Sequence, residues 1–475
     1  MRHRSFRGGV HPNDGKAMSA GSPIEDLLPG SELVFPLSQH IGAPATALVA
    51  VGDRVLKGQL IAGGERSVPI HASVSGNVKA IEKHLTVNGR VGDAIIIEND
   101  GAYEEVPEMA LRTTVEEATV EEIMAAVQGA GIVGLGGAGF PAFIKFKPPQ
   151  MDAIDHIIVN GAECEPYLTS DYRLMLEKGP ELLEGLRLIL KMFPKAKGVI
   201  AIEDNKPDCI EKLTELCKNE ANIEVMALKT KYPQGGERFL IHAVTGRDLN
   251  VDLLPAHLGC IVNNVATVIA IYEAVCLHRP LISKVVTVTG DAIRNPKNFR
   301  VPMGMSYDEI AKAAGGFDKE PEKLVSGGPM MGQAMFSLEV PVSKITSALL
   351  ALSHDEVADF EPTACIRCGR CVEACPENLV PVKMMDACEH KDFHRYVDLN
   401  GMECCECGTC TYVCPAKRRL TQAFKDARNF VRLERRIEAE KKKAAEAKKA
   451  ADERRAKDEQ KNLEAKAEKE KGGNA

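Results

Sequence analysis

The sequence C-I-R-C-G-R-C-V-E-A-C-P occupies residues 365–376, and C-C-E-C-G-T-C-T-Y-V-C-P occupies residues 404–415. Both stretches fit the pattern C-x-x-C-x-x-C-x-x-x-C-P. The two-residue gaps let a tight loop place three thiolates around one metal cluster, whereas the three-residue gap and the proline direct the fourth thiolate away. The repeat therefore predicts two iron–sulfur clusters that exchange their fourth ligand.

This spacing is that of bacterial two-cluster ferredoxins, and it assigns a ligand set to each [4Fe–4S] cluster. The first set is Cys365, Cys368, Cys371 and Cys414, and the second is Cys404, Cys407, Cys410 and Cys375. The alternative is a pair of zinc ribbons, but these close four-ligand sites with C-x-x-C pairs and need neither the third cysteine nor the prolines. The sequence therefore favours a ferredoxin domain of short helices and loops.

Length and charge limit the class of protein. The chain has 475 residues, more than a single core supports, so several domains are expected. A net charge of −7 without a basic, aromatic-rich stripe argues against a nucleic-acid partner. Iron-bearing thiolates imply a reducing compartment. We find neither a signal peptide nor an apolar run that could cross a bilayer, and we expect a soluble or peripheral cytoplasmic protein.

Residues 33–97 contain many short alternating runs rich in Val, Ile and Gly, which is typical of short strands joined by turns. Two similar halves, P-A-T-A-L-V-A-V-G-D-R-V-L-K-G-Q-L-I-A and I-H-A-S-V-S-G-N-V-K-A-I, resemble the barrel-sandwich hybrid domain of biotinyl and lipoyl carriers. In those carriers a lysine at a hairpin tip takes the prosthetic group. The tip here lies near residues 67–69 and has no lysine, so we expect a docking module.

From Thr114 the pattern changes to helices that alternate with strands, which predicts an α/β layer domain. Strands are expected at D-H-I-I-V-N, K-G-V-I-A-I-E and I-E-V-M-A-L. Asn160, Glu163 and Glu165 directly follow the first of these strands. Ligands of open α/β sheets bind at the carboxyl ends of strands, so this position favours a binding role.

Four loops in this domain carry polar residues in or near glycine-containing stretches: G-L-G-G-A-G-F-P, V-N-G-A-E-C-E-P, Y-P-Q-G-G-E and, after the glycine of G-C, I-V-N-N-V-A-T. The G-x-G-x-x-G match in the first loop is weak alone, because a helix precedes it instead of a strand. Glycines let backbone N–H groups approach a phosphate, Lys145 would add positive charge, and the paired amides offer donors and acceptors. Together the loops predict a site for a phosphate-bearing cofactor.

The four loops resemble the flavin and NADH loops of the complex I 51-kDa (NuoF-type) subunit. With the N-terminal F-R-G-G-V-H-P, the segment L-S-Q-H-I-G-A-P-A and the ferredoxin pair, the order of motifs resembles the C subunits of Rnf electron-transport complexes over about residues 6–423. The resemblance implies a Rossmann-like α/β domain that binds FMN and NAD(H). It places FMN at Gly134, Gly136, Gly137, Gly139, Lys145, Asn160, Glu163, Tyr232, Gly235, Glu237, Asn263, Asn264 and Thr267, and the nicotinamide nucleotide at Phe140, Phe146 and Glu165.

Two positions depart from that pattern. Ala162 stands where NuoF-type proteins carry an acidic residue two places after the asparagine, which removes one hydrogen bond to the cofactor. The segment V-D-L-L-P-A-H-L-G replaces a stretch rich in Pro, Lys and Phe before V-N-N. The resemblance therefore holds more closely for the flavin pocket than for the NADH pocket.

The C-terminal half contains two further regions. Residues 284–343 begin with K-V-V-T-V-T-G, continue with a helix near residues 307–314 and end in S-G-G-P-M-M-G, which resembles the soluble-ligand-binding β-grasp (SLBB) domain. We interpret Met330 and Met331 in that last turn as adaptable core residues. The Ala-, Glu- and Lys-rich tail favours a solvated helix without the apolar stripe of a coiled coil; contact with anionic lipid or a partner is the alternative.

The expected organisation has five parts: residues 1–113 with the hybrid at about 33–97, 114–283 for FMN and NADH, 284–350 for the β-grasp domain, 351–425 for the clusters and 426–475 for the helical tail.

The histidines His71, His156, His242 and His257 are not spaced like a metal site, so we interpret them as core or loop residues. Cys164 and Cys405 are extra thiols beside the expected cofactors, either packed or reactive.

The resemblance implies a function that joins these parts. Hydride donors deliver two electrons together and cubanes accept one, and a flavin resolves this mismatch. The chain would be the peripheral NADH-binding, electron-input subunit of an ion-translocating NADH:ferredoxin oxidoreductase, at the cytoplasmic face of the inner membrane, with the complex's membrane subunits and a ferredoxin as partners. One alternative is a nucleotide-free relay and docking subunit. The other is a cobalamin-reductase-type flavoprotein, and the N-terminal segments F-R-G-G-V-H-P and L-S-Q-H-I-G-A-P-A argue against this second alternative.

Overall fold

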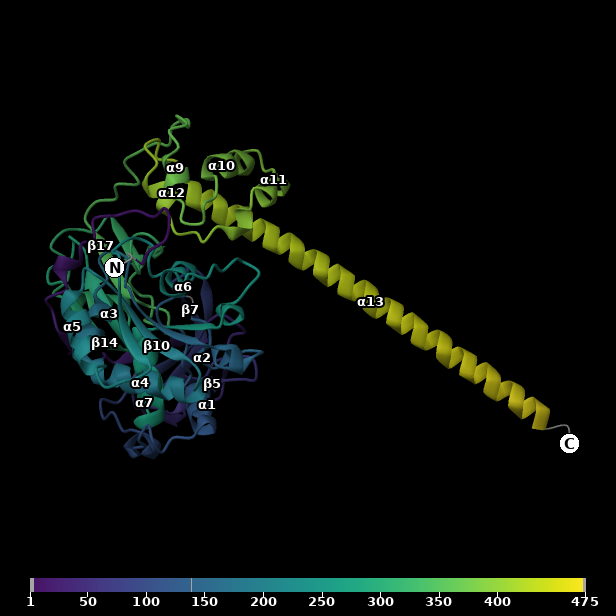
Figure 1. Cartoon of the computed structure of the whole chain (residues 1–475). Coiled ribbons are helices and arrows are strands. Elements are labelled where there is room, and N and C mark those ends of the chain that lie inside the picture. The colour runs from purple at the N-terminus through teal and green to yellow at the C-terminus, as the bar shows by residue number, and fades with distance from the viewer. Residues whose placement is uncertain (1–3, 138, 473–475) are drawn as a thin grey trace. The chain divides into compact units, whose positions relative to one another are not determined.

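Four β-sheets organise the chain between residues 24 and 352 of the part that the structure describes. The structure is a computed structural model that describes residues 4–137 and 139–472, with side chains as far as residue 461 (Figure 1). Contacts divide the chain into two compact units, Met1–Asn378 with Cys407–Arg418, and Leu379–Glu406 with Arg419–Ala475. The four sheets and both ends of the expected nucleotide domain lie in the first unit.

Two small antiparallel sheets form the N-terminal hybrid. One has the order β2 (Glu32–Pro36), β8 (Val91–Asn99), β7 (Gly76–Leu85), β4 (Arg54–Val55), and the other β3 (Thr46–Ala47), β5 (Leu60–Gly63), β6 (Ile70–His71). Alternate residues Leu33 and Phe35 of β2 are buried, as the alternating sequence predicts, whereas β8 buries four successive residues, 94–97. The expected hairpin tip is the turn between β5 and β6.

The α/β domain has a four-stranded parallel sheet in the order β11 (Ile223–Leu228), β10 (Lys197–Glu203), β9 (His156–Gly161), β12 (Cys260–Asn264). The sequence predicted β10 and β11 with these bounds. Both faces of the sheet are covered: Ile157 and Val159 lie in one apolar core and Ile158 in another. Two-sided burial explains why these strands are continuous apolar runs.

Helices cover this sheet on its two faces. They are α1 (Val120–Gly129), α2 (Ala142–Lys145), α3 (Ser170–Glu177), α4 (Gly179–Met192), α5 (Pro207–Leu216), α6 (Glu237–Thr245) and α7 (Val265–Cys276). Helices α4 and α7 pack against each other and share the core that holds Ile157. Leu240 and Ile241 of α6 lie in the core on the opposite face. The parallel strands therefore all direct their carboxyl ends towards one edge, where the expected loops begin.

A mixed six-stranded sheet follows, in the order β1 (Ile24–Asp26), β14 (Lys297–Pro302), β13 (Ser283–Thr289), β17 (Ala348–Leu352), β15 (Lys323–Ser326), β16 (Gln333–Met335), with helix α8 (Tyr307–Ala313). This is the expected β-grasp region. One detail of the prediction is wrong: Met331 is 55% exposed and does not fill the core. It lies in the turn after β15, where backbone geometry and not packing sets its place.

The C-terminal part is helical. Short helices α9 (Arg370–Glu373) and α12 (Thr409–Tyr412) belong to the first unit, and α10 (Pro381–Glu389), α11 (Phe393–Asp398) and α13 (Leu420–Gly472) to the second. Within the second unit, the beginning of α13 packs Phe424 near Tyr396, with ring centroids 6.1 Å apart. Beyond residue 432 every α13 side chain that the structure describes is exposed, so the tail is the solvated helix expected; residues 473–475 lie outside the described residues.

Short 3₁₀ turns complete the secondary structure at Lys16–Met18, Pro107–Ala110, Met151–Ala153, Pro255–Leu258 and Gly401–Glu403. Among the residues that the structure describes, no helix has both the length and the apolar character that a membrane crossing requires.

The contact between α4 and α7 provides a test of the core. A Cβ on Gly185 of α4 would lie 2.2 Å from the carbonyl oxygen of Val268 in α7. We expect Gly185→Ala to lower the free energy of unfolding by about 2 kcal/mol, because one helix must move. The matched control is Gly129→Ala at the end of α1, where nothing lies within 4 Å of the new Cβ. It should gain about 0.5 kcal/mol.

Urea unfolding followed by circular dichroism measures both variants. Equal stability of the Gly185→Ala protein and the unmodified protein would contradict the close approach of the two helices.

Candidate functional site

The four expected loops meet at the carboxyl edge of the parallel sheet. Asn160, at the end of β9, donates from Nδ2 to the carbonyl oxygen of Gly235 over 2.8 Å, which joins the second loop to the third. The N–H of Leu135 donates to Oγ1 of Thr267 over 2.9 Å, which joins the first loop to the fourth. Lys145 Nζ donates to the carbonyl oxygen of Val262 over 2.9 Å. These bonds bring together residues that are up to 132 positions apart.

The first loop uses its glycines in different ways. A Cβ on Gly136 would lie 2.7 Å from Nδ2 of Asn264, so only glycine allows this approach. Gly139 has a φ of +73°, and a Cβ there would lie 2.7 Å from Cγ2 of Ile345. Gly137 has nothing within 4 Å of its Cβ position and is exposed. The backbone at Gly137 therefore faces open space, as a cradle for a ligand requires.

The paired amides Asn263 and Asn264 differ in their partners. Asn264 accepts from the N–H of Ala266 over 2.9 Å and so caps α7, and its Nδ2 donates to Oδ2 of Asp171 over 2.6 Å. Asn263 is 3% exposed and its Nδ2 has no hydrogen-bond partner among the described residues. Asn264 therefore positions the loops, whereas Asn263 keeps a free donor for a ligand.

Both acidic residues of the second loop bind backbone N–H groups. Glu163 accepts from Asp171 over 2.7 Å and from Tyr172 over 3.3 Å, and thereby binds the first turn of α3. Glu165 accepts from Met330 over 2.7 Å and from Met331 over 3.0 Å, in the turn after β15. Burial raises the pKa of Glu165. These carboxylates hold the second loop in place.

The two aromatic residues expected at the nicotinamide nucleotide lie in different surroundings. Phe140 belongs to the first loop and is 37% exposed. Phe146 is fully buried, with its ring centroid 6.3 Å from that of Phe193. Phe146 thus packs in the domain core and Phe140 is the accessible ring of the two, while the nicotinamide role of both residues stays a prediction.

Tyr232 links the third loop to the cysteine-rich region. Its hydroxyl is buried and donates to the carbonyl oxygen of Cys407 over 2.7 Å. The N-terminal segment reaches the same place, because Val10 pairs with Tyr232 and the N–H of Gly9 donates to the carbonyl oxygen of Ala374 over 2.9 Å. The sequence did not predict this use of the N-terminal segment, since its contacts are all with distant residues.

The cysteines expected to hold the first cluster lie near one another in the first unit. Burial and the neighbouring thiols of Cys414, Cys365 and Cys368 raise the pKa of Cys371. Cys365 and Cys368 are exposed. Of the second set, Cys375, Cys407 and Cys410 belong to the first unit and Cys404 to the second. Within the second unit, Arg428 donates to the carbonyl oxygen of Cys404.

Buried lysines near the loops are a feature that sequence reasoning missed. Lys206 donates to the carbonyl oxygen of Ala162 over 2.7 Å and lies 3.6 Å from Glu203. Lys284 donates to the carbonyl oxygen of Leu135 over 2.6 Å. Burial lowers the pKa of Lys284 to about 7. No local signal marks these lysines, because they contact the loops from other strands and turns.

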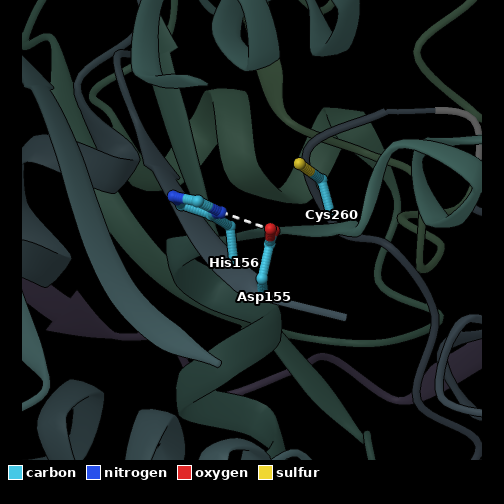
Figure 2. A group of neighbouring side chains, drawn as sticks. All are labelled: Asp155, His156 and Cys260. Carbon is cyan, nitrogen blue, oxygen red and sulfur yellow. Dashed lines mark hydrogen bonds and ion pairs between the residues drawn. The ribbon is translucent and has the colours of Figure 1, made fainter. Parts of the chain in front are cut away.

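A second group of polar side chains lies at the opposite, amino edge of the sheet. Figure 2 shows Asp155 and His156 at the beginning of β9, with Cys260 of β12 nearby. Arg247 donates to both carboxylate oxygens of Asp155, over 2.7 Å and 2.6 Å, and holds the pKa of Asp155 down at about 2. A metal ion would have to displace this bidentate ion pair. We therefore interpret the group as structural.

Asp171 gives the site a pH dependence. Burial and the nearby Glu163 carboxylate raise its pKa to about 7 from 3.8, so the folded protein holds a proton that the unfolded chain has released. Stability from this group is therefore lost as pH rises from about 4 to 7. Asp171→Asn keeps an oxygen that accepts from Asn264 but does not titrate.

We expect the free energy of unfolding of Asp171→Asn, relative to the unmodified protein, to improve by about 1 kcal/mol per pH unit between about pH 5 and pH 7. Asp152→Asn, at a carboxyl group with 91% exposure, is the surface control. Urea unfolding across this pH range measures the difference. Parallel curves for Asp171→Asn and the unmodified protein would refute the raised pKa of Asp171.

Comparison with known domain families matches almost every region. An RnfC barrel-sandwich hybrid domain matches residues 4–102, a Nuo51 FMN-binding domain 127–273, an SLBB domain 285–334 and a 4Fe-4S dicluster domain 364–417. The expected fold class, with its four kinds of domain, is thereby confirmed.

Curated relatives match over nearly the whole chain. The C subunit of a proton-translocating ferredoxin:NAD(+) oxidoreductase complex from Clostridium ljungdahlii is 45% identical, over 88% of this chain and 92% of that one. The C subunit of a Na(+)-translocating ferredoxin:NAD(+) oxidoreductase complex from Acetobacterium woodii is 41% identical, over 92% and 99%. The C subunit of an ion-translocating oxidoreductase complex from Rhodobacter capsulatus is 41% identical, over 80% and 74%. The chain therefore belongs to the family of C subunits of ion-translocating ferredoxin:NAD(+) oxidoreductase complexes, the RnfC family.

Proposed function

We propose that this chain is the peripheral, NADH-binding electron-input subunit of an ion-translocating ferredoxin:NAD(+) oxidoreductase. Its partners are the membrane subunits of that complex, and a ferredoxin is the electron partner of the complete complex. The relatives that are 45% and 41% identical are named as subunits of such complexes. Iron-bearing thiolates require a reducing compartment, which supports a place at the cytoplasmic face of the membrane.

The loop edge fits a flavin by its donor set. Asn263 offers a buried Nδ2 without a protein partner among the described residues, and the backbone at Gly137 borders open space. A ring with carbonyl acceptors would satisfy the amide, and a phosphate would accept from loop N–H groups. We assign the flavin to these residues together with the other FMN positions given by the family resemblance, and the nicotinamide nucleotide to the side of Phe140 and Glu165.

The observation that carries the proposal is the hydrogen bond from Tyr232 to the carbonyl oxygen of Cys407, 2.7 Å long. It joins the third cofactor loop directly to the backbone of an expected cluster ligand. A bound flavin would take up a hydride and release single electrons, which is the chemistry needed between NADH and cubane clusters. The chain's own residues keep the two kinds of site adjacent and keep Tyr232 out of water.

Reduction by NADH tests the function. The full-length chain, isolated with its flavin and clusters, should lose visible absorbance on addition of NADH, because electrons from the nucleotide reach both kinds of centre. Dithionite serves as the control that reduces the clusters directly. Clusters that dithionite reduces and NADH never does would refute the NADH role. Intact clusters without any flavin would instead favour a nucleotide-free relay subunit.

Iron content tests the ligand assignment. The unmodified chain should carry about eight irons, and Cys368→Ser should carry about four, because one thiolate of the first set is lost. Cys405→Ser is the matched control, since the C-x-x-C-x-x-C-x-x-x-C-P pattern does not need Cys405. Iron analysis and electron paramagnetic resonance after dithionite treatment measure the outcome. Equal losses in the two variants would make Cys405 a ligand.

A further inference from the structure

Gln234, in the third loop, is a buried amide without partners. Its side chain is fully buried, and neither Nε2 nor Oε1 has a hydrogen-bond partner among the described residues. Burying a donor and an acceptor unpaired is unfavourable, and native proteins rarely keep such groups. A leucine or methionine would fill the same space without this cost. The polar ends of Gln234 therefore call for a bonding partner other than the residues that the structure describes.

Other buried amides in the molecule show the usual arrangement. Gln39 donates to the carbonyl oxygen of Pro36 over 2.9 Å and accepts from the N–H of Lys344 over 3.2 Å. The half-buried Asn160 and Asn264 likewise each use both ends of the amide group. Among the residues that the structure describes, Gln234 has both amide atoms unpartnered and Asn263 has one.

These two amides flank the end of β9. Asn160 pairs in register with Asn264, the neighbour of Asn263, and Nδ2 of Asn160 binds the carbonyl oxygen of Gly235, the neighbour of Gln234. A Cβ on Gly235 would lie 3.4 Å from the Cβ of Ala162. The backbone beside Gln234 is thus held against Ala162, the position at which NuoF-type proteins carry an acid.

We propose that the Gln234 carboxamide is a flavin-binding residue, which donates one hydrogen bond and accepts one at the polar edge of the isoalloxazine ring. This rests on the proposed function and adds a residue to its site. The uracil-like edge of that ring presents an N–H between two carbonyl groups, which complements an amide. The neutral amide supplies the polar contact that Ala162 lacks, without adding a negative charge.

Gln234→Met tests the assignment, because methionine keeps the length of the side chain and removes both polar ends. FMN is titrated into flavin-depleted full-length protein and binding is followed by quenching of FMN fluorescence. We expect about tenfold weaker binding of FMN. The flavin-depleted variant should unfold at the same urea concentration as the unmodified protein or at a higher one, because no protein hydrogen bond is lost.

Gln39→Met is the matched control. Its amide is bonded to protein atoms, so the substitution should lower the urea midpoint of the flavin-depleted protein. A third variant, Gln234→Glu, places a carboxylate at the ring. At a pH high enough to ionise this buried acid, it should lower the midpoint potential of the bound flavin, since a negative charge opposes the addition of electrons.

Two outcomes overturn the proposal. One is unchanged FMN affinity in Gln234→Met. The other is a loss of stability in flavin-depleted Gln234→Met that matches the loss in Gln39→Met, which would make Gln234 a core residue. Failure of the unmodified protein to bind FMN would refute the proposed function itself and is seen before any variant is compared.

Discussion

The hydrogen bond from Asn264 Nδ2 to Asp171 Oδ2, 2.6 Å long, is the interaction on which the loop edge depends. The other end of the same amide caps α7, so Asn264 cannot rotate without losing both bonds. Asp171 lies in the first turn of the helix whose first N–H groups are held by Glu163. Because Asp171 is half-buried, breaking the bond would leave its carboxyl group without this donor in a partly desolvated place, which is more costly than losing a surface contact. One amide thus fixes β12, α7 and α3 relative to the Gly136 backbone that lies against it.

Long cationic side chains hold the same loops from within the domain. Lys206, Lys284 and Lys145 donate to the carbonyl oxygens of Ala162, Leu135 and Val262. Carbonyl oxygens at the ends of strands and in tight loops lack ladder partners, and a lysine can reach them from several residues away. Desolvation of the ammonium group opposes this arrangement, as the lowered pKa of Lys284 indicates. These bonds tie the described parts of the loops to the rest of the domain through protein contacts alone.

The sequence predicts those features that local pattern controls. The bounds of β10 follow from an apolar run that is buried on two faces and those of β11 from a shorter, partly buried one, and the cysteine spacing alone indicates two clusters. Features that depend on distant partners were not predictable. Tyr232 and Cys407 are 175 residues apart, and Glu165 binds N–H groups 165 and 166 residues away. Phe146 shows the same dependence: its motif is local, whereas the packing of its ring near Phe193 is not visible in that motif.

The charge balance explains why alanine suits position 162. A half-buried Asp171 and a buried Glu203 already lie at this edge, and desolvation is the largest cause that raises the pKa of each to about 7. Lys206 is engaged by Glu203 and by the carbonyl oxygen of Ala162 itself. A carboxylate at 162 would add a third buried acid without a free cation among these groups, and repulsion would raise all three pKa values further. An uncharged amide in the neighbouring loop provides hydrogen bonds at the same place without that repulsion.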